Sequence, residues 1–273
     1  MRLDPAGGLP AGRVEIHRSG EGPMRHQQVA DNIFTIAGTH VNMVLLRDGR
    51  DLTLIDAGWH GDATTIEKSI RALGHRPEDI KAILLTHAHL DHVGALNHLH
   101  RHYAIPVYTS EIEVAHARGE VHESATPLDV IKRLTDLDTI GWAARITAAG
   151  GLRKNPVPHI QPFPAEGALD FPGNPIPIPS PGHTSGHSAF YLPNAGAVAT
   201  GDTLVTAHPT SKIEGPQLLP DFFNHSTPKT LAALAALESL AADLVLPGHG
   251  DPFTEGIGQA VARARTHAAT DLT

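Results

Sequence analysis

The stretch Thr86-His87-Ala88-His89-Leu90-Asp91-His92 decides the fold, and it directly follows the apolar run Ala82–Leu85. Side chains two apart in an extended segment point the same way, so His87 and His89 can bind one metal ion as a pair. Asp91 and His92 come after the chain bends and can face a neighbouring position. Imidazole nitrogen and carboxylate oxygen suit zinc, and also iron or manganese. The stretch predicts a metal site after a buried strand rather than a histidine-rich solvent loop.

Other ligand types also follow apolar strands. Asp56 ends the strand Leu52–Ile55 before a glycine turn, and we expect it to hold a ligand imidazole from behind the metal. His183 is presented by a Pro-Gly turn, Asp202 follows Gly201 at a strand end, and His249 stands in Pro-Gly-His-Gly. The two oxygens of Asp202 can bridge two cations. Ligands collected at strand ends in both halves of a chain predict one site on one edge of a layered fold.

Composition limits the function. The chain of 273 residues has 21 Lys+Arg against 29 Asp+Glu, a net charge of −8, which disfavours nucleic-acid and anionic-membrane partners. It has 20 histidines and no cysteine, so any metal must be held by His, Asp or Glu. The first residues lack the apolar stretch of a signal peptide, and no run has the length of a membrane span. We expect a cytoplasmic protein with a small-molecule substrate, and the sequence allows a homodimer.

The pattern predicts an irregular lead-in over residues 1–28, with a short strand near Val14–His17, and a single domain over 29–273. Asp48-Gly49 is a hairpin signal inside an antiparallel meander. The stretch 119–155 stays open: 130–137 and 142–149 have helical spacing, and Trp142 and Ile146 fit either the core or a cavity wall. The proline-dense stretch 156–181 is extended and unsuited to a central strand. Other predicted elements are strands 33–36, 41–46, 52–55, 105–108, 188–192, 197–200 and 244–246, and helices 62–73 (capped by Asp62), 93–103, 110–118, one starting at Thr227, and 258–269.

These motifs together resemble the metallo-β-lactamase superfamily, from about Ile33 to Phe253. The resemblance implies an αββα sandwich, an α/β fold of two mixed β-sheets face to face with helices on the outer faces. It also implies two divalent metal ions, with zinc expected and iron or manganese as alternatives. By the family pattern the first metal is held by His87, His89 and His183, the second by Asp91, His92 and His249, with Asp202 bridging and Asp56 as the orienting carboxylate.

The implied activity is a metal-dependent hydrolase that uses a metal-bridging hydroxide on a small ester, thioester or lactone. Asp91 could orient the nucleophile and shuttle its proton. Several branches of the superfamily fit less well. Only residues 251–273 follow the last motif, too few for the helical domain of glyoxalase II, although the ligand motifs resemble it. Val205 stands where acyl-homoserine lactonases usually have tyrosine. Asp202 argues against true β-lactamases, and His89 against flavodiiron proteins.

Two alternatives stay open. One is a mononuclear iron persulfide dioxygenase, which resembles this chain in its motifs but uses one iron. The other is a non-catalytic metal-binding sensor. Loop residues would set specificity, and His225 is the candidate for an acid near the leaving group. The other candidates for lining the cleft are Trp59, His60, His208, Phe222 and Phe223.

Overall fold

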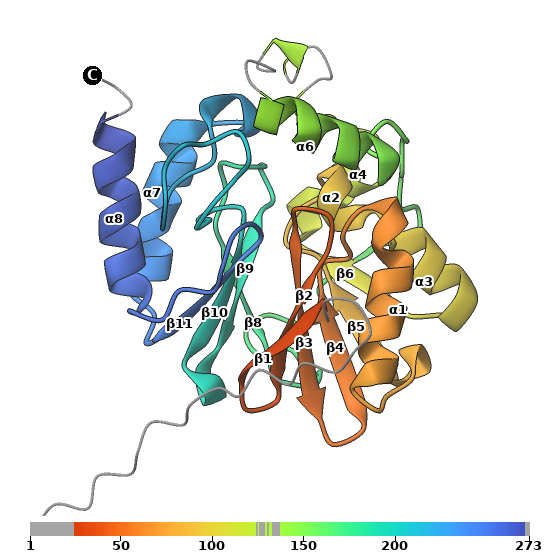
Figure 1. The fold of residues 1–273 in the computed structure, drawn as a ribbon. Coiled ribbons are helices and arrows are strands. Elements are labelled where there is room, and N and C mark those ends of the chain that lie inside the picture. Colours follow the sequence, from red (N-terminus) through yellow and green to blue (C-terminus); the bar gives the residue numbers. More distant parts are fainter. Residues whose placement is uncertain (1–24, 124, 126–128, 130, 133–136, 271–273) are drawn as a thin grey trace, which may run out of the picture.

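The computed structural model describes residues 25–123, 125, 129, 131–132 and 137–270. Two β-sheets pack face to face, and helices cover their outer faces (Figure 1). The αββα sandwich implied by the resemblance is confirmed. No helix in the described parts of the chain is both long and apolar enough to cross a bilayer.

The larger sheet joins strands of the first part of the chain in sequence order, β1 to β7. The first four strands pair antiparallel as the predicted meander, and β4 to β7 pair in parallel. Parallel pairing brings the carboxyl ends of β4, β5 and β6 to one edge. The strands are β1 His26–Ala30, β2 Ile33–Ala37, β3 Asn42–Asp48, β4 Asp51–Ile55, β5 Ile80–Leu84, β6 Val107–Thr109 and β7 Gln161–Pro162.

The smaller sheet has the order β11-β10-β9-β8. Only β10 and β11 pair in parallel, and β8, β9 and β10 pair antiparallel. The proline-rich strand β8 lies at the sheet edge, as its missing backbone donors require. The strands are β8 Ile176–Pro179, β9 Ser188–Leu192, β10 Ala197–Gly201 and β11 Leu244–Pro247.

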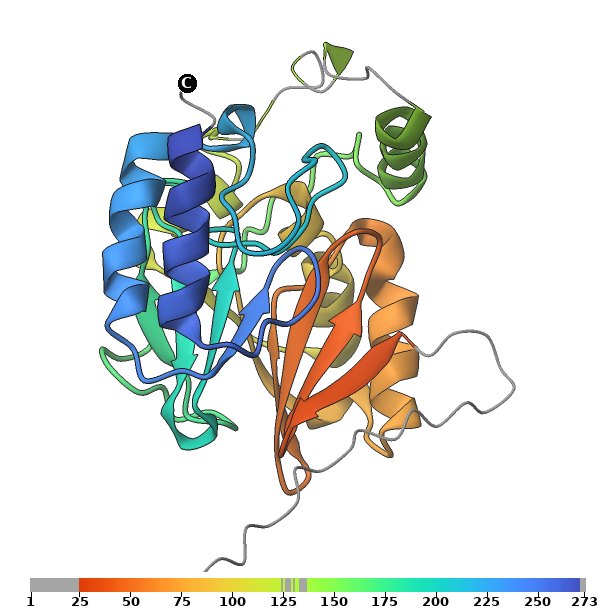
Figure 2. The ribbon, with the colours of Figure 1, turned by 60° about the vertical axis from the view of Figure 1, so that its left-hand side comes forward.

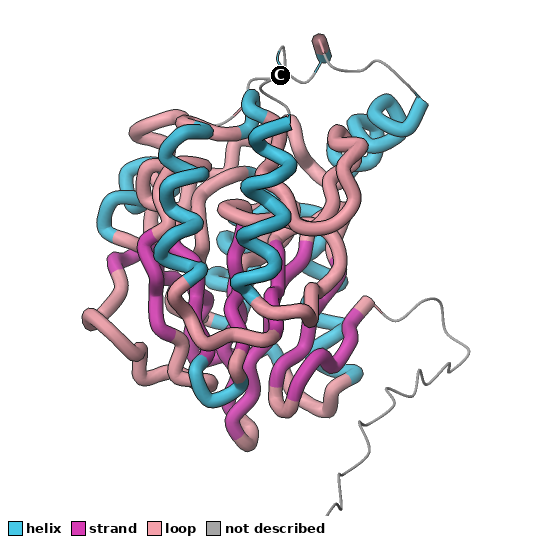
Figure 3. The backbone as a smooth tube through the Cα atoms, turned by 90° about the vertical axis from the view of Figure 1, so that its left-hand side faces the viewer, coloured by secondary structure: helices cyan, strands magenta, loops and turns pink. Residues whose placement is uncertain are grey.

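Helices α1 and α3 flank the larger sheet, and α7 and α8 lie side by side over the smaller one (Figures 2 and 3). Helix α6 lies across one end of the sandwich (Figure 1). The helices are α1 Ala63–Ala72, α2 Leu90–Val93, α3 Leu96–Tyr103, α4 Val114–Ala117, α6 Leu137–Ala148, α7 Thr227–Glu238 and α8 Ile257–Thr270. Short 3₁₀ turns are η1 His60–Asp62, η2 Pro77–Asp79, η3 Glu111–Glu113, η4 Pro193–Ala195 and η5 Asp221–Phe223.

The core has three layers. Between the sheets, side chains such as Val44, Leu84 and Phe190 form a central cluster. A second cluster fills the space between the larger sheet and helices α1 and α3, and a third lies under α7 and α8. Because apolar side chains cover both faces of each sheet, the polar residues that follow the strands are gathered at the sheet edge.

Three expectations need correction. Strand β1 begins at His26, inside the predicted irregular lead-in. It is held by backbone pairing with β2, and because its glutamines are exposed, its sequence does not alternate between apolar and polar residues. Asp62 does not cap α1, because its carboxylate accepts hydrogen bonds from the backbone of Thr39 and Trp59 instead. The predicted helix 93–103 begins later, as α3 at Leu96, because residues 90–93 form the separate turn of helix α2. The predicted strand near Val14–His17 lies outside the described residues, as does most of 130–137.

Candidate metal centre

Seven side chains from four segments meet at one end of the sandwich. The loop after β5 supplies His87 and His89, and helix α2, which follows it, supplies Asp91 and His92. The loops after β8, β10 and β11 supply the other three, His183, Asp202 and His249. All the predicted metal ligands therefore lie together, although they span both sheets.

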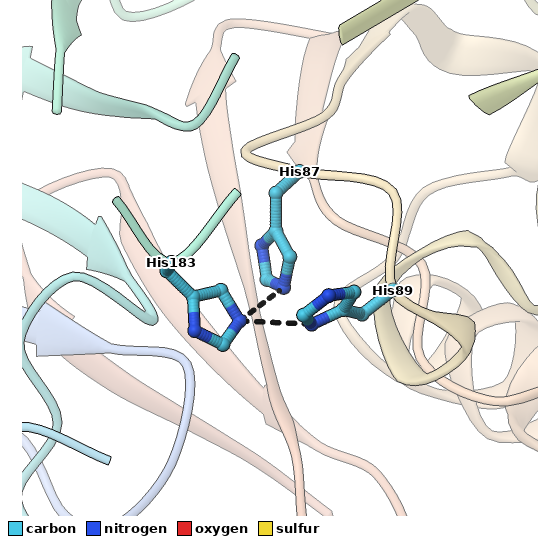
Figure 4. A group of neighbouring side chains, drawn as sticks. All are labelled: His87, His89 and His183. Atoms are coloured by element: carbon cyan, nitrogen blue, oxygen red, sulfur yellow. Dashed lines mark hydrogen bonds between the residues drawn. The ribbon is translucent and has the colours of Figure 1, made fainter. Parts of the chain in front are cut away.

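The first group consists of His87, His89 and His183, all of them buried. The Nε2 atom of His183 lies 3.1 Å from His87 Nε2 and 2.8 Å from His89 Nδ1 (Figure 4). Donor atoms that surround a tetrahedral zinc at about 2.0–2.1 Å lie roughly 3.3 Å apart. The two distances from His183 Nε2 are slightly shorter than that spacing.

The second group lies beside the first. His249 Nε2 is 3.4 Å from Asp91 Oδ2 and 3.1 Å from Asp202 Oδ2. The same Asp202 oxygen is 3.5 Å from His183 Nε2, and the other, Oδ1, is 3.5 Å from His92 Nε2. The Asp202 carboxylate therefore stands between the two groups: its Oδ2 lies near histidines of both groups, and its Oδ1 lies near His92 of the second.

In each of these imidazoles, the outer nitrogen, which is the ring nitrogen that faces away from the cluster, contacts an oxygen atom. Asn224 shows how the proton is fixed: its amide nitrogen donates to Leu219 O, so its Oδ1 accepts from His183 Nδ1. Such contacts set the tautomer of a metal-binding histidine. The pairs are His87 Nδ1 with Thr86 Oγ1 (3.0 Å), His89 Nε2 with Glu123 O (3.2 Å), His92 Nδ1 with Asp56 Oδ2 (2.8 Å), His183 Nδ1 with Asn224 Oδ1 (3.0 Å) and His249 Nδ1 with His40 O (2.6 Å).

This arrangement fits a cation. Once the outer nitrogens carry the protons, the inner nitrogens of neutral rings present lone pairs to one another at 2.8–3.1 Å. Moreover, His92 Nε2 and Asp202 Oδ1 are buried and lack a hydrogen-bond partner among the described residues. Buried polar atoms without partners are costly and rare. Divalent ions would satisfy both the lone pairs and the orphaned atoms.

Asp56 has the predicted position behind a candidate ligand. Besides His92 Nδ1, its carboxylate accepts hydrogen bonds from the backbone nitrogen and the hydroxyl of Thr86, each at 2.8 Å. Its φ of 62° is left-handed, which costs a residue other than glycine roughly 1–2 kcal/mol. The surrounding hydrogen bonds offset this strain and fix the carboxylate between the two loops.

The close approach of the last loop requires glycine. A Cβ atom on Gly248 would lie 2.2 Å from Asp202 Oδ1. Asn42 of β3 holds the same loop, because its side-chain nitrogen donates to the carbonyls of Pro247 and Gly250. These contacts bring His249 to the cluster.

The pKa values of the cluster histidines indicate that its carboxylates need a neighbouring positive charge. Burial and the neighbouring imidazoles lower the pKa of His87 and His183 well below the usual value, so these rings are neutral. Burial also lowers the pKa of His249, but the carboxylates of Asp202 and Asp91 together outweigh it and raise that pKa to about 10. Without a metal, the carboxylates therefore hold protons on the adjacent ring. A metal ion would take the place of that charge.

Glu113, which the sequence did not single out, connects two of the loops. Its buried carboxylate accepts hydrogen bonds from Ala88 N at 2.8 Å, Thr184 Oγ1 at 2.8 Å and Gly186 N at 3.0 Å, and it also contacts His116 Nδ1 at 2.8 Å. Burial alone raises the pKa of Glu113, but its hydrogen bonds outweigh this effect and keep that pKa below the usual value. A charged carboxylate therefore links the loops that carry His87, His89 and His183.

A cavity of about 770 Å³ opens over the cluster. Trp142 and Ile146 of α6 line it, so they form a cavity wall, one of the two roles left open by the sequence. Of the candidate lining residues, Trp59, His208 and Phe223 line this cavity. His60 lines a separate hollow of about 100 Å³, and Phe222 packs on Phe223 at 4.0 Å without lining the cavity.

His225 does not have the predicted position. Its backbone nitrogen donates to His183 O, but its side chain is exposed and does not line the cavity. The neighbouring Asn224 makes the contact with the candidate ligand instead. Nothing in the local sequence indicates which of the two adjacent polar residues turns inward. His208 lines the cavity, and burial lowers its pKa to about 3, so its ring is neutral.

Comparison with known proteins agrees with this fold. The family model of the metallo-beta-lactamase superfamily matches residues 36–249, and the chain belongs to that superfamily. The probable metallo-hydrolase YflN of Bacillus subtilis (strain 168) is 27% identical over 211 residues, which cover 74% of this chain and 76% of the relative.

One further sequence relative and one solved structure are also similar to this chain. An atrochrysone carboxyl ACP thioesterase of Aspergillus fumigatus is 25% identical over 209 residues, 77% of this chain and 50% of that protein. A metallo-β-lactamase structure from Cronobacter sakazakii superposes with a TM-score of 0.64 at 20% identity, and the match covers 92% of this chain and 95% of that one. At that identity the likeness establishes the fold alone.

Proposed function

We propose that this protein is a binuclear metal-dependent hydrolase that cleaves a small ester, thioester or lactone. One observation carries the proposal: the predicted ligands form a single cluster at the base of a cavity large enough for a small molecule. The superfamily supports hydrolysis, and the relative named as a thioesterase supports a carbonyl substrate, although the match covers half of that relative.

The ligand groups assign the residues. His87, His89 and His183 would hold one ion, Asp91, His92 and His249 the other, and Asp202 would bridge them. Bound divalent ions would activate water and polarise the substrate carbonyl. In the net reaction, water adds its oxygen to the acyl carbon, the bond to the leaving oxygen or sulfur breaks, and the leaving atom takes a proton.

The protein side chains have separate tasks in this proposal. Asp91 lines the cavity, so its carboxylate can take a proton from the attacking water and return it. Asp56 and Asn224 orient ligand imidazoles through their outer nitrogens. The walls contributed by Trp59 and Trp142 exclude bulk water from the reacting carbonyl.

Elemental analysis and a substrate panel test the proposal. Protein purified without added metal should contain about two divalent ions per chain and hydrolyse lactones or thioesters. His249→Ala should lower both metal content and turnover, whereas His102→Ala, which alters an exposed histidine of α3, should change neither. One iron per chain with oxygen uptake on glutathione persulfide would support the dioxygenase instead. Bound metal without turnover across the panel would favour the sensor.

A further inference from the structure

Apolar side chains make up most of the described lining of the cavity above the cluster. Its described lining residues include no lysine and no arginine. Its carboxylates, Asp91 and Asp202, and its candidate ligand histidines belong to the cluster at its base, and away from that base the polar side chains include Thr147 and His208. Cavities that recognise carboxylates or phosphates normally present cations to them. Among its described residues, this cavity offers a substrate anion no lysine or arginine partner beyond the metal centre.

The wall of the cavity is built from aromatic side chains of separate segments. Trp142 of α6 is buried and meets Phe223 of η5 edge-to-face, with ring centroids 6.4 Å apart. The neutral ring of His208 packs against both, at 5.5 and 4.9 Å. On another side, Ile146 packs against the cluster that contains Trp59. Such packed aromatic walls bury apolar surface with little loss of side-chain freedom.

The apolar character continues to the surface. Ile140 and Leu152 both line the cavity, yet their exposed fractions are 48% and 70%. Exposed apolar side chains gathered around one cavity are more typical of a binding site than of ordinary surface. An apolar path therefore runs from the cluster to solvent, and a chain attached to the reacting carbonyl could follow it.

We propose that the site selects neutral substrates with an aliphatic acyl chain. The reacting carbonyl lies at the cluster, and the chain lies against Trp142, Ile146 and Phe223. This inference rests on the proposed function, because it names the substrate class of the same site. A carboxylate at the far end of the chain would be desolvated beside apolar side chains without a counter-ion, which is strongly unfavourable.

A series of N-acetylcysteamine thioesters tests the inference on the metal-loaded protein. From butanoyl through hexanoyl to octanoyl, kcat/KM should rise roughly fourfold per added methylene, the gain expected from burying one CH₂ group. Suberoyl, which ends the octanoyl chain in a carboxylate, should fall roughly tenfold or more below octanoyl. Octanamide should also bind the chelated protein more tightly than butanamide, which measures the cavity without turnover.

Leu152→Arg supplies the missing cation at the mouth of the cavity. It should raise the suberoyl to octanoyl ratio of kcat/KM by roughly fivefold, which corresponds to one ion pair of about 1 kcal/mol. Leu137→Arg is the matched control, because Leu137 is 86% exposed and does not line the cavity. It should leave the ratio unchanged.

The outcomes separate the two proposals. Hydrolysis with no dependence on chain length, or a preference for suberoyl, would overturn this inference and leave the proposed function standing. An equal response of the two arginine variants would also overturn it. If the metal-loaded protein hydrolyses no ester, thioester or lactone, the proposed function fails, and this inference fails with it.

Discussion

Glu113→Gln should destabilise the protein although it changes a single atom of the carboxylate. Oε1 accepts from Ala88 N and Oε2 from Gly186 N. An amide has one acceptor oxygen, so in either orientation its NH₂ group faces one of these backbone N–H groups. One buried donor then loses its partner, and the remaining hydrogen bonds lose the charge that strengthens them. Together these effects should lower the free energy of unfolding by about 3 kcal/mol.

The same change should weaken metal binding. Glu113 joins Ala88, which lies between two candidate ligands, to Thr184, which follows a third. Residues that orient metal ligands typically change metal affinity by roughly 10–100-fold when they are altered. We therefore expect zinc affinity to fall within that range, measured by competition with a chromophoric chelator.

Urea unfolding of the chelated protein, followed by circular dichroism, measures the stability without a contribution from bound metal. Glu111→Gln is the control, because it removes the same charge from an exposed position in the same 3₁₀ turn, η3. It should stay within roughly 0.5 kcal/mol of the parent protein. If Glu113→Gln were equally mild in both assays, the carboxylate would not connect the loops as described.

Three further changes test other parts of the structure. Asn224→Ala should weaken zinc binding roughly tenfold or more, while His225→Ala should change it little; the reverse order in a chelator competition would contradict the placement of these side chains. Gly94→Ala places a Cβ atom 2.1 Å from the backbone carbonyl carbon of Trp59 and should lower the free energy of unfolding in urea by roughly 3 kcal/mol or more. Gly258→Ala in α8 adds a Cβ atom that meets nothing within 4 Å, and it should raise that free energy by about 0.5–1 kcal/mol. Backbone hydrogen bonding lowers the pKa of Asp79 in the folded protein, so its charged form stabilises the fold above the ordinary value of 3.8 and this stabilisation is lost as pH falls through the lower folded value. The urea midpoint of Asp79→Asn should therefore lie below that of the parent protein at pH 7 and approach it in acid. A difference between the two midpoints that does not change with pH would refute this.

The sequence was most informative where a ligand follows a strand directly. His87, Asp202 and His249 each stand at the end of an apolar run, and the spacing predicts which side chains leave the sheet edge. Local pattern therefore located the cluster and, through the resemblance, the fold. It could not provide contacts between distant segments, such as the bond between Asn224 and a histidine 41 positions away.

The failures have physical reasons. Strand β1 is held at the sheet edge by backbone hydrogen bonds to β2, and its side chains do not need to alternate between apolar and polar residues. Asp62 is a suitable helix cap by its type, but tertiary contacts with Thr39 use its oxygens. Glu113 stands in an unremarkable turn, and only the folded chain brings Ala88 and Gly186 to it. The side chains of Asn224 and His225 point in different directions, and the sequence of a loop does not indicate which of two adjacent residues points inward.

The candidate ligands come in two sets, four residues after β5 of the larger sheet and three from loops of the smaller one. Direct backbone bonds such as Ser188 N to Thr86 O also cross this seam. Ions bound there would cross-link the two halves of the sandwich, so metal supply would govern how long the folded chain survives proteolysis as well as its turnover. In the stripped protein, amide protons at this end should exchange before those at the opposite end.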